Sequence, residues 1–129
     1  MDQGRSRVRS FEDLAVWRLG MEVAEAVYAA SSGFPPSERF GLTAQIRRAA
    51  VSIPSNIAEG HARRSTRDFL RFLSMAAGSL AEIRTQLLLA RRLDFIPQDT
   101  ANLLVRLDET SCTLQGLIGS LNTKLAPNP

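Results

Sequence analysis

Cysteine and histidine are nearly absent from this chain of 129 residues, which contains only Cys112 and His61. One cysteine excludes an intramolecular disulfide. Zinc sites and His-dependent nucleophiles need clusters that two such residues cannot supply. Metal sites in helical bundles use Glu-x-x-His pairs from two helices, whereas Glu59 stands two residues before His61 and has no second copy. No glycine-rich phosphate loop is present either. We therefore expect no catalytic residues, no metal and no cofactor.

Long apolar runs are also missing, since charged residues interrupt every stretch before the roughly 20 residues that a bilayer requires. The N-terminus carries Arg5, Arg7 and Arg9 but continues into Phe11-Glu12-Asp13, not into the apolar core of a signal peptide. We expect a cytoplasmic protein without membrane contact. The expected organisation is a basic tail over residues 1–10, one helical domain over residues 11–125 and a short tail over residues 126–129.

What the sequence does contain is helical periodicity, because apolar residues recur every three or four positions through most of its length. The first helix is predicted to begin after Ser10, with Asp13 completing a variant capping box, and to end near Gly33 before Pro35 and Pro36. Its predicted buried stripe is Leu14, Trp17, Met21, Ala24 and Tyr28.

The second helix is predicted from Arg39 or Gly41 to Ala58, with Gly60 as its terminator. Pro54 lies inside it and removes a backbone hydrogen bond, so the helix is expected either to kink there or to divide into two shorter helices. The polar groups nearby are expected to satisfy the opened turn. The predicted inward stripe is Leu42, Ile46, Ala49, Ile53 and Ile57.

Two further helices complete the prediction. The third opens at Ser65 with Asp68 as a capping box, and its Gly78 suggests a close approach between helices. The fourth is expected to start at Pro97, whose missing amide proton suits a first helical position. Short connections favour an antiparallel, up-down four-helix bundle of the all-α class. The predicted stripes are Phe69, Leu73, Ala76, Leu80, Ile83, Leu87 and Ala90 in the third helix, and Leu103, Leu107, Thr110, Leu114, Leu117 and Leu121 in the fourth.

Charge is distributed unevenly although the chain's net charge is only +3. Residues 11–38 are acidic overall and residues 39–71 are basic, and every basic side chain of the chain except Lys124 is arginine. Arginine binds phosphate in a bidentate manner, so a nucleic-acid surface is one interpretation. A solvated surface cluster, with arginine enriched by coding bias, is the other. The candidate contact residues are Arg47, Arg48, Arg63, Arg64, Arg67 and Arg71.

Several sequence motifs resemble one family. They are Phe11-Glu12-Asp13-Leu14-Ala15-Val16-Trp17, Phe40-Gly41-Leu42 with Gln45 and Arg47-Arg48-Ala49, Ser52-Ile53-Pro54-Ser55-Asn56-Ile57-Ala58-Glu59-Gly60, and Arg71-Phe72-Leu73 continuing to Gln86-Leu87. Together they are similar to the 23S ribosomal RNA intervening-sequence proteins. The resemblance implies a four-helix bundle that assembles into a ring-shaped homopentamer, as in the related accessory proteins of diversity-generating retroelements, which bind nucleic acid and partner a reverse transcriptase. It implies no enzymatic activity.

Two functions follow as hypotheses. The first is a non-enzymatic homo-oligomer that binds RNA or DNA through its arginine-rich surface. The second is a protein-interaction scaffold that docks a partner enzyme such as a reverse transcriptase, in which the arginines only balance the acidic segment 11–38.

Overall fold

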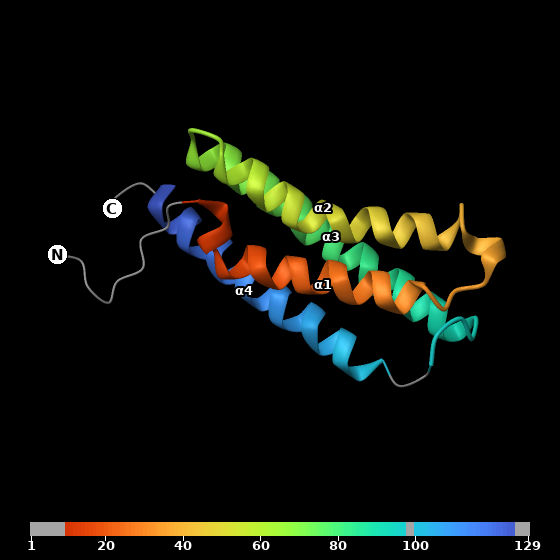
Figure 1. The fold of residues 1–129 in the computed structure, drawn as a ribbon. Helices are drawn as coiled ribbons and strands as arrows, with labels where there is room; N and C mark the ends of the chain where they lie inside the picture. The colour runs from red at the N-terminus through yellow and green to blue at the C-terminus, as the bar shows by residue number, and fades with distance from the viewer. Residues whose placement is uncertain (1–9, 98–99, 126–129) are drawn as a thin grey trace.

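Four long helices make up most of the part of the chain that the computed structural model describes, residues 10–97 and 100–125. Two short 3-10 turns precede the first two helices, and these ranges contain no strand. Successive helices run in opposite directions along the bundle (Figure 1). The prediction of an all-α, antiparallel four-helix bundle is therefore confirmed. The elements are η1 (Phe11–Asp13), α1 (Ala15–Ser31), η2 (Pro36–Glu38), α2 (Leu42–His61), α3 (Thr66–Arg92) and α4 (Ala101–Leu125).

Each helix packs against two neighbours. α2 lies between α1 and α3, and α4 contacts α1 and α3 on the opposite side, with the largest interface between α2 and α3. The stripes of α2, α3 and α4 form the core, with Phe69 and Leu117 half-buried against it, so these three predictions are confirmed in outline. Burying an aliphatic side chain of this size contributes roughly 1.5–3 kcal/mol. The largest fully buried apolar side chains include Ile46, Ile53, Ile57, Leu73, Ile83, Leu87 and Leu114.

The buried face of α1 differs from the predicted one. Met21 and Tyr28 remain 38% and 44% exposed. A Cβ atom at Gly20 would lie 3.0 Å from Cγ2 of Ile53, so the glycine lets α2 approach closely. The predicted stripe followed the bulkiest residues, but the helix packs through smaller ones. The buried residues of α1 are Val16, Gly20, Val23, Val27 and Ser31.

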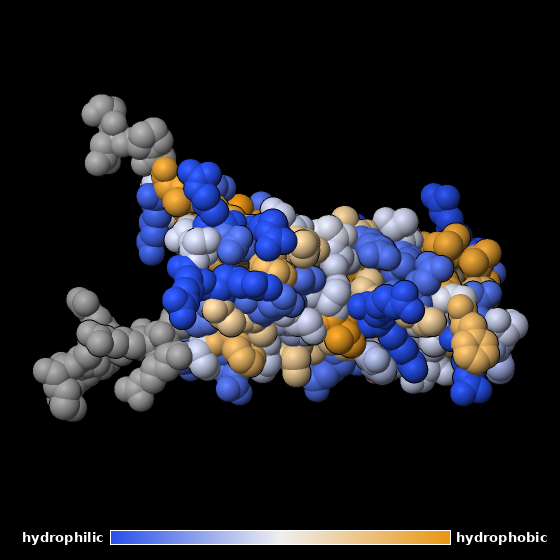
Figure 2. Space-filling view, turned by 90° about the horizontal axis from the view of Figure 1, so that it is seen from above, coloured by the Kyte–Doolittle hydropathy of each residue, from blue (hydrophilic) through white to orange (hydrophobic). Residues whose placement is uncertain are grey.

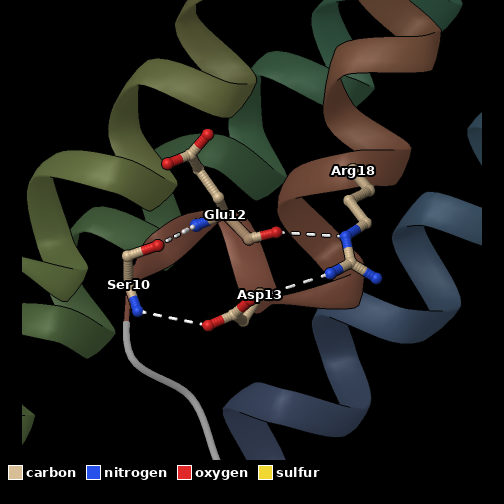
Figure 3. A network of polar contacts seen from close by, with 4 residues as sticks. All are labelled: Ser10, Glu12, Asp13 and Arg18. Carbon is tan, nitrogen blue, oxygen red and sulfur yellow. Dashed lines mark hydrogen bonds and ion pairs between the residues drawn. The ribbon is translucent and has the colours of Figure 1, made fainter. Parts of the chain in front are cut away.

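A short network organises the start of α1 (Figure 3). The Ser10 hydroxyl accepts a hydrogen bond from the Glu12 amide at 3.2 Å, and the Ser10 amide donates to Asp13 Oδ2 at 3.4 Å. This confirms the capping box, but the box encloses η1, and α1 itself begins only at Ala15. Arg18 Nε donates to the Glu12 carbonyl at 3.0 Å and so ties η1 to α1.

Helix α2 is continuous through Pro54 and ends at His61. The structure therefore contains one helix and not two, and Gly60 lies inside it and does not terminate it. Asn56 Nδ2 donates to the Ser52 carbonyl at 2.8 Å, and the Ser52 hydroxyl donates to the Ala49 carbonyl at 2.6 Å. The carbonyl that Pro54 leaves without an amide donor is that of Ala50, and these two side-chain bonds go to its neighbours Ala49 and Ser52. The kink at Pro54 stays a prediction.

The turn after α3 is a Schellman motif. The Phe95 amide donates to the Ala90 carbonyl at 2.9 Å, the Asp94 amide donates to the Arg91 carbonyl, and Asp94 adopts a φ of 60°. Helix α4 begins at Ala101, four residues beyond Pro97, so the predicted start was wrong. The predicted tails, residues 1–10 and 126–129, lie outside the described residues except for Ser10.

Candidate nucleic-acid interface

Four of the six candidate arginines gather where α2 passes into α3. Arg63 and Arg64 occupy the turn between the helices, and Arg67 and Arg71 lie on the first turns of α3. All four are exposed. We call them the α2–α3 corner, and they lie at the end of the bundle where the ribbon of α2 turns back into α3 (Figure 1).

Phe72 connects two of these arginines. The Cζ atom of Arg63 lies 4.9 Å from the centroid of the Phe72 ring, and that of Arg71 lies 4.7 Å from it. Phe72 itself is only 6% exposed, so its ring belongs to the α2–α3 packing. A cation over an aromatic ring is stabilised by the ring's quadrupole. One aromatic side chain therefore supports two guanidinium groups from different elements.

Carboxylates hold the same two guanidinium groups from the side. Arg63 Nη2 lies 2.8 Å from Glu59 Oε2, and Arg71 Nη2 lies 3.8 Å from Asp68 Oδ1. Both pairs have about half of their side-chain surface exposed, so each contributes little to stability. Their effect is to restrict where the guanidinium groups lie.

Gly60 allows this arrangement. A Cβ atom at this position would lie 2.7 Å from Cβ of Phe72 and 3.0 Å from Cδ1 of Phe69. Any larger residue would push α3 away from α2 at this end. Gly78 faces open space instead, so the close approach predicted there was wrong and occurs at Gly60 and Gly20.

The other two corner arginines are unpaired within the described part of the chain. Arg64 and Arg67 form no hydrogen bond, ion pair or ring contact with any described residue. Together with Glu59 and Asp68, the corner holds four guanidinium groups against two carboxylates, which leaves two positive charges. This excess is available to an anionic partner.

Arg47 and Arg48 do not belong to the corner. Arg48 lies 13 positions before His61, the last residue of α2, which is about 20 Å along the helix at 1.5 Å per residue. Arg47 turns toward the end of α1, where its Nε donates to the Ser31 hydroxyl at 2.7 Å and its Nη2 to the Tyr28 carbonyl at 3.3 Å. Its Cζ also lies 4.6 Å from the Tyr28 ring centroid. Arg47 thus satisfies the C-terminal end of α1, a favourable place for a cation.

Arg48 is exposed and forms no hydrogen bond, ion pair or ring contact with residues 10–97 and 100–125. Neither Arg47 nor Arg48 is paired with an acidic side chain among the described residues. Glu59 pairs with Arg63, and carbonyl and hydroxyl oxygens serve Arg47. Glu59 and Arg63 are four residues apart, the spacing at which side chains on a helix lie next to each other.

A second surface feature is an apolar groove between α1 and α2. It includes Met21 and Val51, which are 38% and 45% exposed. The face drawn in Figure 2 mixes hydrophilic and hydrophobic groups along the whole bundle. The groove is lined by Trp17, Met21, Ala24, Val51, Pro54, Ser55 and Ala58. Three of these residues belong to the stripe that was predicted to be buried.

Sequence reasoning missed Phe72 and Gly60 as parts of this site. Phe72 directly follows Arg71 in the sequence, and this position was the available signal. Within the described residues, no cluster of His, Cys, Asp or Glu could hold a metal ion. None of the described helices has the length and hydropathy to span a membrane.

Comparison with known proteins agrees with this architecture. A search of curated proteins finds no match. The family model described as 23S rRNA-intervening sequence protein matches residues 12–116, which include α1, α2, α3, the α2–α3 corner and most of α4. On this match, the chain belongs to the 23S rRNA-intervening sequence protein family.

Proposed function

We propose that this chain is a non-enzymatic, homo-oligomeric four-helix bundle protein that binds RNA or DNA through the α2–α3 corner. The observation that carries the proposal is the corner itself, where four exposed arginines from two elements converge and two of them have no partner among the described residues. Arginine in such a group makes charge-assisted contacts to phosphate oxygens.

This mode of binding is electrostatic and insensitive to base sequence. Each neutralised phosphate releases counterions, so affinity falls steeply with salt. One corner with two excess charges would bind weakly. An oligomer would present several corners to one polynucleotide, and linked contacts raise the overall affinity by orders of magnitude.

Self-association is part of the proposal, and the α1–α2 groove supports it. Met21 and Val51 expose apolar surface on both of its sides, and burying such surface favours association. A ring-shaped homopentamer is the assembly that the family resemblance implies. Met21→Glu combined with Val51→Glu should convert the oligomer to a monomer with an unchanged helical circular-dichroism spectrum. If the parent protein and the double variant have the same mass in size-exclusion chromatography with light scattering, this expectation is contradicted.

The six candidate arginines take different parts in the proposal. Arg63, Arg64, Arg67 and Arg71 form the main contact surface, and Arg48 serves as a separate contact, about 20 Å along α2 from the end of the helix that leads into the corner. Arg47 is the weakest candidate because its donors already bond the end of α1.

Charge reversal tests the proposal directly. Arg63→Glu, Arg64→Glu and Arg67→Glu together should abolish retention on immobilised RNA and DNA at low salt, because the corner then becomes acidic. Circular dichroism and oligomer mass serve as controls for folding and assembly. If the triple variant binds as tightly as the parent protein, the corner is not the contact surface.

The alternative function is a scaffold that docks a partner enzyme such as a reverse transcriptase. Glu25 on the exposed side of α1, within the acidic segment 11–38, favours a basic protein partner, whereas Glu22 already pairs with Arg106 at 2.7 Å. Pull-down with and without nuclease separates the two functions. A contact that involves only protein survives digestion, whereas one mediated by nucleic acid is lost.

A further inference from the structure

We propose that the α2–α3 corner prefers single-stranded polynucleotide over duplex, because the guanidinium groups of Arg63 and Arg71 act as stacking surfaces for unpaired bases. The inference rests on the proposed function and specifies the form of nucleic acid that the corner takes. It is carried by the two contacts to Phe72, at 4.9 and 4.7 Å, which a purely electrostatic surface does not require.

The first step concerns the orientation of the two side chains. A free arginine on a helix surface samples many rotamers, and fixing it on a ligand costs conformational entropy. Arg63 and Arg71 are already restricted by the ring beneath them and by Glu59 and Asp68 beside them. Their side chains nevertheless remain 44% and 55% exposed, so about half of each side chain stays accessible to a ligand.

The second step concerns what such a group can bind. Guanidinium planes and aromatic rings are the side-chain surfaces on which unpaired bases stack. In a duplex, the faces of the bases are hidden in the stack, and a protein reaches only edges, sugars and phosphates. A supported guanidinium group therefore gains an additional contact with a single strand and none with a duplex.

The third step concerns charge. Glu59 and Asp68 offset the two stacked arginines, so their contribution to phosphate attraction is reduced. Arg64 and Arg67 keep their full charge and lie in the same corner. The corner thus divides into a pair suited to stacking and a pair suited to phosphate, a combination typical of surfaces that bind single strands.

Lysine substitution separates stacking from charge. Arg63→Lys with Arg71→Lys keeps both positive charges but removes both guanidinium planes. The matched control, Arg64→Lys with Arg67→Lys, makes the same chemical change at the two unpaired positions. All four side chains are exposed, so both variants are expected to fold.

The measurement is fluorescence anisotropy with three labelled probes, an oligouridine dodecamer, an oligothymidine dodecamer and a duplex of the same length, at several salt concentrations. The parent protein should bind both single strands more tightly than the duplex. Arg63→Lys with Arg71→Lys should weaken single-strand binding by about tenfold, the size of one lost stacking contact, and leave duplex binding and the salt slope unchanged. The control variant, Arg64→Lys with Arg67→Lys, should lose much less affinity for the single strands. The two single-stranded probes also report whether RNA or DNA is preferred.

Two results would overturn the inference and leave the proposed function intact. They are equal binding of duplex and single strand by the parent protein, and equal losses in the two lysine variants. Absence of binding to all three probes would instead refute the proposed function as well. Phe72→Leu provides a second check, since it keeps every charge and removes only the ring. It should reproduce the selective loss of single-strand binding.

Discussion

Arg47 donates three hydrogen bonds to the end of α1, whereas Arg64 and Arg67 form no hydrogen bond, ion pair or ring contact with any described residue. All three lie in the basic segment 39–71 and look equivalent in the sequence. The first closes a helix terminus inside its own subunit, and the other two are left for a partner. An arginine cluster therefore indicates a binding surface only if arginines that bond to their own subunit are not counted.

The largest stability difference is expected between these two kinds of arginine. Arg47→Ala should lower the free energy of unfolding by roughly 2–3 kcal/mol, because it leaves the end of α1 without charged donors and removes the contact with Tyr28. Arg67→Ala should change it by less than about 0.5 kcal/mol. Urea denaturation of both variants measures the difference. Equal stabilities would show that Arg47 is not a structural residue.

A second comparison concerns two glycines, Gly60 in α2 and Gly78 in α3. Gly60→Ala should destabilise the protein by about 2 kcal/mol, since its Cβ would meet Phe72 at 2.7 Å. It should also weaken nucleic-acid binding, because Phe72 supports Arg63 and Arg71.

The matched control is Gly78→Ala, which should stabilise α3 by about 0.5–1 kcal/mol because Gly78 faces open space. Thermal and urea unfolding of the two variants should therefore move in opposite directions. A Gly60→Ala protein as stable as the parent would show that close packing does not position the corner.

The smallest effect is expected at the turn between α3 and α4. Asp94 adopts a φ of 60° in a Schellman motif, a position that glycine occupies without steric cost. Asp94→Gly should raise the free energy of unfolding by about 0.5 kcal/mol and leave nucleic-acid binding unchanged. A lower melting temperature would indicate that the aspartate makes a contact that offsets its backbone strain.

Much of the fold is predictable from the sequence because three of the helices repeat large aliphatic residues at heptad spacing. Leu73, Ile83 and Leu87 are buried as their spacing requires. The buried stripe of α1 was predicted wrongly because the prediction chose the largest apolar residues, whereas the helix packs through smaller ones. Gly20 determines the interface of α1 with α2, and a glycine gives no signal in a pattern of apolar residues.

The site was predictable in location but not in composition. The charge distribution pointed to residues 39–71, and four arginines do converge there. The partner of each arginine depends on contacts between elements. Arg47, for example, bonds to Ser31, which is sixteen residues away in the chain. Local spacing cannot show such contacts.

The central claim is that the α2–α3 corner is the nucleic-acid surface. It is tested most directly by comparing two variants with the same change in net charge, one at the corner and one at the opposite end of the bundle. Arg64→Glu with Arg67→Glu changes the corner. Arg39→Glu with Arg92→Glu makes the same charge change at exposed sites, one just before α2 begins and one at the last residue of α3. These two helix ends lie opposite the corner (Figure 1). Affinity for an oligouridine dodecamer at low salt is measured for both. The account predicts a loss of at least about tenfold for the corner variant and a small loss for the control. Equal losses would show that net charge, and not the corner, governs binding.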